Sequence, residues 1–435
     1  MINLFVVVLN SLDFHNPWAD FVNMVDEYSS FAESDGVSGA RQATMGAIVE
    51  ILLREDAVSR AEIARRTGLS KQTASEVIRI LEDSGWIKLR GQTRGTLGRR
   101  ALTYELDSRN ALVLGVDLGG TKLRLALADL RGNILGEDVQ PTDPRGGHAV
   151  VEQIRSMTAA LVARLGIPMG RVRQCILGSP GVFQPESGAI HLAPNIPGLD
   201  AFDVAGALSA SLGFPVAIEN DVNLATLGER RSGAPANMVF IALGTGIGMG
   251  ILADGRLVQG ARGCAGEVAY LPLGGDPFDA RGARLGTLET AVGSVAIKER
   301  YRGRGGDPAL DVRGIFERLV AGDPAATATI DEVARILATV VMAARALLDP
   351  ETVVFGGSVG ARTELVERVR HLIGLHAGGQ PEVRVSALGT DAVLFGAVGM
   401  ALDRLHDRLF GINPGAVRVA AATACGSGLS DEAAA

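Results

Sequence analysis

Two segments that contain glycine and threonine, each placed between two apolar runs, constrain the fold of this chain more than any other feature. They read DLGGTK at residues 117–122 and GTG at residues 244–246. The flanking runs have the length of buried strands, and glycine lets a turn approach a phosphate because it has no Cβ. A plain glycine-rich hairpin remains the alternative for each segment. Two such hairpins about 125 residues apart predict two similar lobes that face one nucleotide.

A polar cluster, Glu-Asn-Asp-Val-Asn at residues 219–223, lies between these segments and directly follows the apolar residues 216–218. With these motifs in this order, residues 111–405 resemble the ROK family (repressors, open reading frames and sugar kinases). The resemblance implies an α/β chain with the two-lobed, actin-like and hexokinase-like ATPase (ribonuclease H-like) fold. We expect the lobes at about 108–235 and 236–410.

Asp221 stands where the strand over 216–218 should end, and ligands bind at strand ends in α/β sheets. Its carboxylate can accept the proton of a sugar hydroxyl as that oxygen attacks a γ-phosphoryl group. The resemblance assigns the general base of a kinase to this residue. The neighbouring Asn220 can donate and accept hydrogen bonds, which suits a hydroxyl. The alternative is that both residues cap the following helix.

The resemblance also implies further side chains that hold a sugar or the phosphates of a nucleotide. Carboxylates only accept hydrogen bonds, so two glutamates suit the hydroxyl donors of a sugar ring. The alternatives are a turn asparagine at Asn195 and surface or helix-capping glutamates at Glu267 and Glu289. The expected sugar-binding residues are Asn195, Asn220, Asp221, Glu267, Tyr270 and Glu289. The expected phosphate-binding residues are Asp117, Gly119, Gly120, Thr121, Lys122, Gly244, Thr245, Gly246, Gly356 and Gly357.

One stretch departs from the family pattern. ROK proteins often carry a histidine shortly after the Gly-Glu pair and then a cysteine-rich run, which together bind a structural zinc. Here Tyr270 occupies the histidine position, and residues 271–288 contain no cysteine. A tetrahedral zinc site needs such thiolate and imidazole ligands, so we predict no zinc. Tyr270 can still donate one hydrogen bond to a sugar hydroxyl.

Residues 41–107 predict a winged helix-turn-helix. Apolar residues at helical spacing precede a capping box, in which Ser59 caps a helix and Glu62 should reach back to it. That helix ends at Gly68, and Ser70 can cap a third helix over 71–84. Two short helices joined by a glycine-containing turn are typical of the motif. Strands over 86–89 and 101–106 would form the wing.

The charge of this region indicates DNA binding. Residues 41–107 carry 12 basic and 9 acidic side chains, whereas the whole chain has a net charge of −7. Residues 86–100 hold five basic side chains and no acid, a pattern typical of phosphate contacts. A protein-interaction module with a solvated basic face is the alternative. The expected DNA-binding residues are Ser70, Lys71, Gln72, Thr73, Ser75, Arg79, Arg94, Arg99 and Arg100.

The 435 residues suffice for two or three domains. We expect an unassigned extension at 1–40, the winged domain at 41–107, the sugar-kinase-like domain at 108–410 and a flexible tail at 411–435. Three widely separated cysteines suit a reducing cytoplasm, and no apolar run has the length of a membrane span. The expected partners are operator DNA, a sugar or sugar phosphate effector, and a second copy in a homodimer or a dimer of dimers.

Two functions remain open at this stage. The first is a transcriptional regulator, with repression the favoured sign, that senses a sugar and needs no cofactor to bind DNA. The second is an ATP-dependent sugar kinase of the glucokinase type, working with MgATP, that keeps a DNA-binding appendage. The intact phosphate segments and Asp221 favour a kinase, whereas the winged domain and the missing histidine favour a regulator. The sequence favours the regulator, with residual kinase activity left open.

Overall fold

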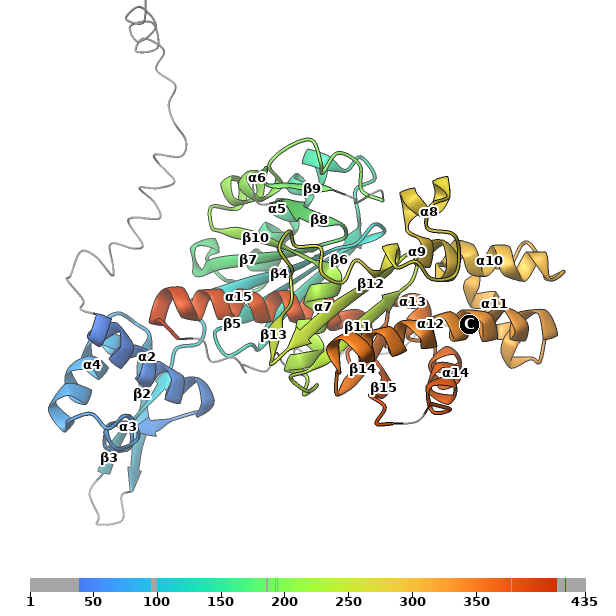
Figure 1. Ribbon diagram of the computed structural model, residues 1–435. Helices are drawn as coiled ribbons and strands as arrows, with labels where there is room; N and C mark the ends of the chain where they lie inside the picture. Colours follow the sequence, from blue (N-terminus) through green and yellow to red (C-terminus); the bar gives the residue numbers. More distant parts are fainter. Residues whose placement is uncertain are drawn as a thin grey trace, which may run out of the picture. The chain divides into compact units, whose positions relative to one another are not determined.

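The computed structural model describes residues 39–94, 100–184, 187–191, 193, 195–376, 378–412 and 419. Its contacts divide the chain into two compact units. The winged unit comprises the chain up to Glu105 together with Phe410–Ile412, and the two-lobed unit contains Leu106–Leu409 (Figure 1). The extension predicted at 1–40 and the tail predicted at 411–435 lie largely outside the described residues. No helix in the described ranges has the length and apolarity needed to cross a membrane.

Within the described residues, the winged unit has three helices and a three-stranded sheet in the order β1-β3-β2. Its elements are α2 (Gly39–Arg54), β1 (Val58–Ser59), α3 (Arg60–Thr67), α4 (Lys71–Asp83), β2 (Ile87–Arg94) and β3 (Arg100–Leu106). Ser59 accepts a hydrogen bond from the Glu62 amide, and Gly68 ends α3 with φ at 69°. The Glu62 carboxylate binds Arg65 and Arg66. The prediction that it reaches back to Ser59, as in a full capping box, is therefore wrong. Two nearby guanidinium groups are stronger partners for a carboxylate than one backbone amide.

The core of the winged unit includes the end of the last helix of the chain. The apolar side of α4 is buried, with Ile78 and Leu81 fully inaccessible. Phe410, the last residue of α15 (Ala392–Phe410), is 1% exposed. Its ring meets that of Trp86 edge to face, with 5.1 Å between the centroids. A Cβ on Gly46 would lie 2.5 Å from the Phe410 carbonyl oxygen, so the backbone also packs closely here.

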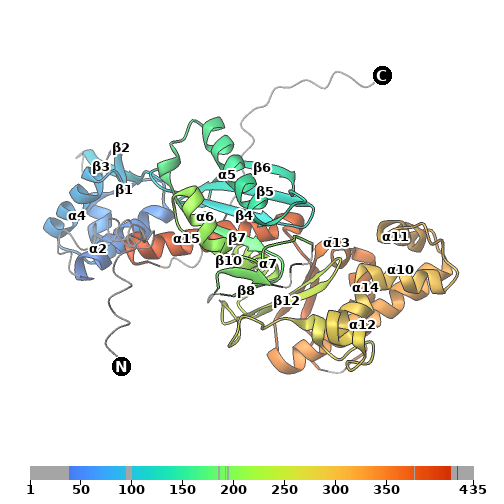
Figure 2. The same cartoon turned by 90° about the horizontal axis from the view of Figure 1, so that it is seen from above.

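The first lobe is built on a five-stranded sheet in the order β10-β7-β4-β5-β6. The strands are β4 (Leu112–Leu118), β5 (Lys122–Asp129), β6 (Ile134–Pro141), β7 (Val172–Ser179) and β10 (Val216–Asn220). β4, β5 and β6 form an antiparallel meander, whereas β7 and β10 run parallel to β4. Helices α5 (Gly147–Arg164) and α6 (Val204–Leu212) cover one face (Figure 2). A short ribbon of β8 (Val182–Gln184) and β9 (Ala189–His191) lies beside them.

The second lobe repeats the plan with a sheet in the order β13-β12-β11-β14-β15. The strands are β11 (Met238–Leu243), β12 (Ile247–Ala253), β13 (Arg256–Leu257), β14 (Thr352–Gly356) and β15 (Glu382–Val385). The helices are α8 (Ala280–Leu285), α9 (Thr287–Val292), α10 (Ser294–Gly303), α11 (Val312–Val320), α12 (Pro324–Leu348), α13 (Gly357–Gly360) and α14 (Thr363–Ile373). The short turns η2 (Val268–Tyr270) and η3 (Gly389–Asp391) complete the lobe. One continuous core joins the sheet to the long α12 and to α14.

Two helices fill the space between the sheets and position the cleft. α7 (Asp221–Arg231) packs on β12, where a Cβ on Gly248 would lie 2.9 Å from Val222 and one on Gly250 would meet Thr226. α15 packs on the first sheet, where a Cβ on Gly115 would lie 2.7 Å from Val398. Because these glycines allow close backbone approach, the N-terminus of α7 is held next to the turn between β11 and β12.

Candidate functional site

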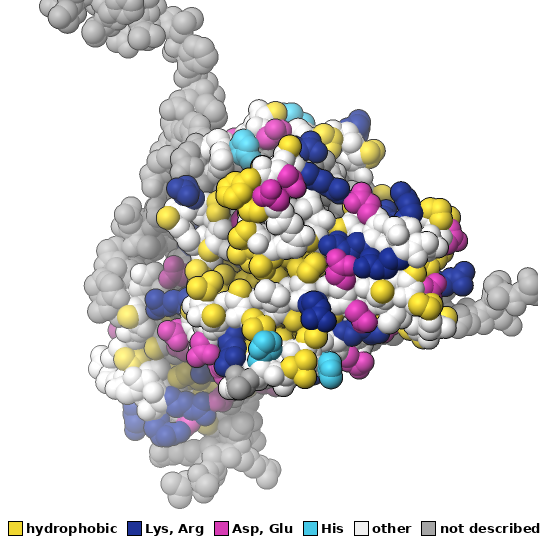
Figure 3. All heavy atoms as spheres, turned by 45° about the vertical axis from the view of Figure 1, so that its right-hand side comes forward, with side chains coloured by type: hydrophobic (Ala, Val, Ile, Leu, Met, Phe, Trp, Pro, Cys, Tyr) yellow, Lys and Arg dark blue, Asp and Glu magenta, His cyan; other side chains and the backbone are white. Residues whose placement is uncertain are grey.

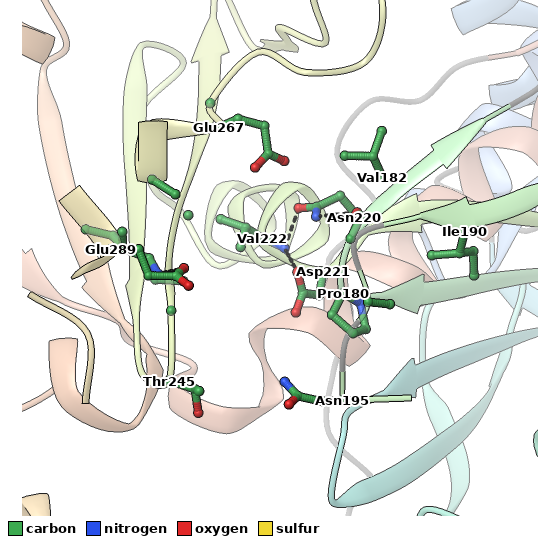
Figure 4. Close-up of a pocket in the computed structure, with 18 of the residues that line it drawn as sticks. Pro180, Val182, Ile190, Asn195, Asn220, Asp221, Val222, Thr245, Glu267 and Glu289 are labelled. Carbon is green, nitrogen blue, oxygen red and sulfur yellow. Dashed lines mark hydrogen bonds between the residues drawn. The ribbon is translucent and has the colours of Figure 1, made fainter. Parts of the chain in front are cut away.

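A cleft of about 810 Å³ lies between the two lobes. Figure 4 shows Asn195, Asn220 and Asp221 on one side and Glu267, Glu289 and Thr245 on the other, with their polar ends turned toward a common space. The first three come from the loop after β9 and from the β10–α7 junction. The others come from the segment before η2, from α9 and from the β11–β12 turn. The predicted sugar-binding residues, Tyr270 included, therefore line one hollow.

Asn220 caps α7, as the alternative interpretation held. Its Oδ1 accepts hydrogen bonds from the amides of Val222 and Asn223, at 2.9 and 3.2 Å. Its Nδ2 donates to the Gly181 carbonyl at 3.0 Å. Only one amide hydrogen of Asn220 is left for a ligand, so this side chain mainly fixes the start of α7.

Asp221 is the first residue of α7 and faces the cleft. Burial raises its pKa to about 7, and the nearby carboxylates of Asp117 and Glu267 add to the rise. Burial also raises the pKa of Asp117, on β4, to about 6, although Arg124 opposes that rise. A carboxyl group with a pKa near neutrality can gain or lose a proton readily, which suits a general base.

The two glutamates of the second lobe face Asp221 across the cleft (Figure 4). Glu289 lies in the first turn of α9, and its Oε2 accepts a hydrogen bond from the Ile247 amide at 3.3 Å. Burial raises the pKa values of both Glu267 and Glu289. Asp221 and Glu267 are close enough for the charge of Glu267 to raise the pKa of Asp221. The three carboxyl groups thus converge, as a site for several hydroxyl donors requires.

The predicted phosphate residues fall into two groups. Gly244, Thr245, Gly246 and Gly357 line the cleft, and Gly357 has φ at 82° because its backbone packs against Leu243. The residues that do not line the cleft are Asp117, Gly119, Gly120, Thr121, Lys122 and Gly356. The β4–β5 turn instead packs against Asn195, because a Cβ on Gly120 would lie 2.8 Å from the Asn195 Cβ.

Sequence reasoning missed two features of the site. Glu219 accepts from the Asn220 amide and Asn223 Nδ2 through Oε1, and from Gln259 Nε2 at 2.7 Å through Oε2. The last bond joins the two lobes, and the only signal for it was the position of Glu219 in the polar cluster. Arg284 on α8 also lines the cleft, and no sequence motif marked it.

The recognition helix α4 presents an exposed polar face. Lys71, Gln72, Thr73 and Arg79 are exposed. Ser70 Oγ accepts from the Thr73 amide at 3.1 Å and lies 2.8 Å from Thr73 Oγ1, whereas Ser75 Oγ donates to the Lys71 carbonyl. These three hydroxyl groups form hydrogen bonds within α4 and its N-terminal cap. The longer side chains of the helix are therefore better placed to reach a ligand. Arg99 and the side chains of Arg94 and Arg100 lie outside the described residues.

Comparisons with known proteins agree with this architecture. The ROK family model matches residues 113–404, and a winged helix-turn-helix DNA-binding model matches residues 41–88. The glucokinase of Halalkalibacterium halodurans is 31% identical over 310 residues, which cover 65% of this chain and 92% of that protein. The DNA-binding transcriptional dual regulator NagC of Escherichia coli is 25% identical over 341 residues, which cover 75% of this chain and 83% of that protein.

A solved structure of a regulator extends over more of the chain than that of a ROK hexokinase does. It is a ROK family transcriptional regulator, a homologue of the E. coli MLC protein, with a TM-score of 0.69. The match covers 86% of this chain and 98% of that one at 22% identity, so it supports the fold alone. The present chain belongs to the ROK family and carries a winged helix-turn-helix DNA-binding domain ahead of its ROK domain.

Proposed function

We propose that this protein is a cytoplasmic, sugar-responsive transcriptional regulator that binds operator DNA. We favour repression over activation as its effect on transcription. The observation that carries the proposal is the presence, in one chain, of an exposed recognition helix and a cleft in which three carboxyl groups converge. The glucokinase match covers 65% of this chain, whereas the match to the regulator NagC covers 75% of it. A winged domain has no role in sugar phosphorylation itself.

A sugar would control DNA binding only if it bound the DNA-competent and DNA-free states with different affinities. The cleft offers such a difference because its walls belong to separate lobes that Glu219 and Gln259 join. We propose that Glu267, Glu289 and Asp221 accept hydrogen bonds from the hydroxyl groups of the sugar, and that Asn195 contacts the same sugar.

We further propose a homodimer or a dimer of dimers, because paired half-sites in an operator match a twofold protein. Light scattering of the full chain measures that state.

The sugar site is tested by thermal shift of the full chain with a panel of hexoses and their derivatives. A binding sugar should raise the melting temperature of the wild type, since a ligand that binds the native state stabilises it. Glu289→Gln should lose most of that increase, because an amide replaces an acceptor-only group with one that also donates. Glu317→Gln, at an exposed position on α11, is the matched control. Equal shifts in all three proteins would contradict the assignment of Glu289.

DNA recognition is tested with two substitutions that should affect DNA binding in different ways. Arg99→Ala should weaken binding to all sequences and reduce the salt slope by about one, because a lost phosphate contact releases one counterion fewer. Gln72→Ala should change the preferred sequence, because Gln72 is exposed near the start of α4. Arg302→Ala, an exposed arginine of the two-lobed unit, should bind DNA like the wild type. If both test variants also behave like the wild type, the recognition surface lies elsewhere.

A sugar kinase is the second candidate, and the cleft gives a specific reason for it. Its volume of about 810 Å³ lies near the top of the range for small-molecule sites, roughly 300–1,000 Å³, so a sugar does not fill it. Gly244, Thr245, Gly246 and Gly357 line the remaining space, where backbone amides can hold the phosphates of MgATP. The residues present do not suit a structural zinc, because Tyr270 and a cysteine-free stretch replace its ligands.

The two candidates are separated by a coupled assay with hexoses and MgATP on the wild type and Asp221→Asn. The regulator predicts no turnover by either protein, together with a thermal shift by a sugar. Turnover that Asp221→Asn abolishes would favour the kinase, because the substitution removes the proposed proton acceptor. The turnover rate of the wild type should then rise as pH increases through about 7, where Asp221 loses its proton.

A further inference from the structure

The helix α8 contributes a different kind of side chain to the cleft from the carboxylates around it. α8 packs against both η2 and α9, the elements that carry Tyr270 and Glu289. Its Arg284 lines the cleft together with those two residues. The adjacent Leu285 is 40% exposed and also lines it. This short helix therefore adds a cation to a cleft whose other charged side chains are mostly carboxylates.

Arg284 has no protein partner among the residues that the structure describes. The other arginine of the same helix, Arg281, forms an ion pair with Glu299 at 3.2 Å. Arg284 forms no ion pair and no hydrogen bond with any described side chain. Burial raises the pKa values of Glu267 and Glu289, and Arg284 does not oppose either rise. The guanidinium group therefore does not neutralise these carboxylates and remains available to a ligand.

A second donor on the same wall is also unused. The Tyr270 side chain is 47% exposed and lines the cleft, and its hydroxyl makes no hydrogen bond within the described ranges. A guanidinium group has five donors and no acceptor, and it binds carboxylates and phosphates with two parallel hydrogen bonds. The group that satisfies both side chains is an acceptor with negative charge.

Basic and acidic side chains are interspersed on this side of the molecule. Figure 3 brings the side of α8 and α10–α12 forward, and Lys and Arg side chains lie on it among Asp and Glu side chains. Several of them are already paired, because Arg300 and Arg304 both bind Glu332. The paired arginines stabilise the helices, whereas Arg284 faces the cleft.

We propose that the effector is a sugar with an anionic substituent, a phosphomonoester or a carboxylate, which Arg284 and Tyr270 bind while Glu267 and Glu289 accept the hydroxyl groups. This inference rests on the proposed sugar site and adds the chemical class of its ligand. The neutral half of the ligand meets acceptors, and its charged half meets donors. A free anion would lack the hydroxyl contacts, and a neutral sugar would leave Arg284 unpaired.

The test is isothermal titration of the full chain with matched ligands. The probes are glucose, mannose and N-acetylglucosamine, their 6-phosphates, the uronic acids of glucose and mannose, and inorganic phosphate. At least one sugar anion should bind ~10- to 100-fold more tightly than its neutral parent, as charge-assisted hydrogen bonds imply. The phosphate and uronate arms identify which anion is recognised. Inorganic phosphate alone should bind more weakly than that sugar anion.

Arg284→Gln should reduce the affinity for the anionic sugar to that of the neutral parent and leave the neutral sugar unaffected. Tyr270→Phe should cause a smaller loss, about 3- to 10-fold, because it removes one neutral hydrogen bond. Arg281→Gln, on the same helix but paired with Glu299, is the control and should match the wild type. The far-UV circular dichroism spectrum checks that each variant is folded.

Three results would overturn the inference. Neutral sugars that bind as tightly as their anionic derivatives would remove the need for an anion site. An equal loss of neutral and anionic affinity in Arg284→Gln would show that the residue supports the wall and does not bind charge. If no sugar binds at all, the proposed sugar site fails as well. Neutral binding without anionic preference overturns only the role of Arg284.

Discussion

Replacing Phe410 by alanine is expected to lower the free energy of unfolding of the winged unit by about 3–5 kcal/mol, as for other buried phenylalanines. The side chain is 1% exposed, and its ring packs edge to face on Trp86. Edge-to-face pairs contribute about 1 kcal/mol beyond the area that they bury. Small domains have total stabilities of about 5–15 kcal/mol, so this loss would remove a large share of the stability of the winged unit.

The expected consequence is a loss of DNA binding without a loss of sugar binding. Residues Phe410–Ile412 belong to the winged unit, whereas Leu106–Leu409 belong to the two-lobed unit. Urea unfolding followed by tryptophan fluorescence measures the first unit, because both tryptophans, Trp18 and Trp86, precede residue 106. The sugar-dependent thermal shift measures the second unit. Phe410→Leu should be milder, because it keeps most of the apolar volume. Arg404→Ala, exposed on the same helix, is the control.

A second measurement separates this packing role from a general effect of the substitution. A fragment of residues 39–107 lacks Phe410 and should be less stable than the winged unit within the full chain. Wild-type stability of that fragment, or normal DNA binding by Phe410→Ala, would show that the C-terminal segment is dispensable. The winged unit would then be complete without residues 410–412.

The local structure of the winged unit could be predicted because its signals are local. Ser59, Gly68 and Ser70 begin or end helices where the sequence placed them. The contribution of Phe410 could not be predicted, because Trp86 is more than 300 residues away in the chain. An apolar residue at a helix end indicates burial but does not name its partner. Our domain boundary at 410 therefore placed this residue with the sugar-kinase-like domain.

The candidate site, too, could be predicted only in part. Asp221, Glu267 and Glu289 were proposed from the family resemblance, and their convergence depends on the close packing of α7 on Gly248 and Gly250. The β4–β5 turn packs against Asn195, and its residues are not among those that line the cleft. Its place depends on how two loops pack, which no local pattern encodes. The same holds for Arg284, because the orientation of α8 follows from its contacts with η2 and α9.

Replacing Asp221 by asparagine is expected to stabilise the ligand-free protein at alkaline pH, by at most roughly 4 kcal/mol. The folded protein raises the pKa of Asp221 from 3.8 to about 7. The protonated carboxyl therefore contributes stability that is fully present below about pH 4 and is lost as pH rises through 7. Above that pH the folded state holds a partly buried charge, whereas asparagine stays neutral.

The pH dependence of this difference distinguishes titration of Asp221 from a simple packing effect. Urea unfolding of both proteins from pH 5 to pH 8.5 should show the advantage of Asp221→Asn growing with pH. Asp117, whose pKa is raised to about 6, remains in both proteins, so most of its contribution cancels in the difference. Asp407→Asn, at an exposed position on α15, should show no such trend. A constant difference across the range would mean that Asp221 keeps its charge in the folded state, and the cleft would then hold a permanent anion ready for hydroxyl donors.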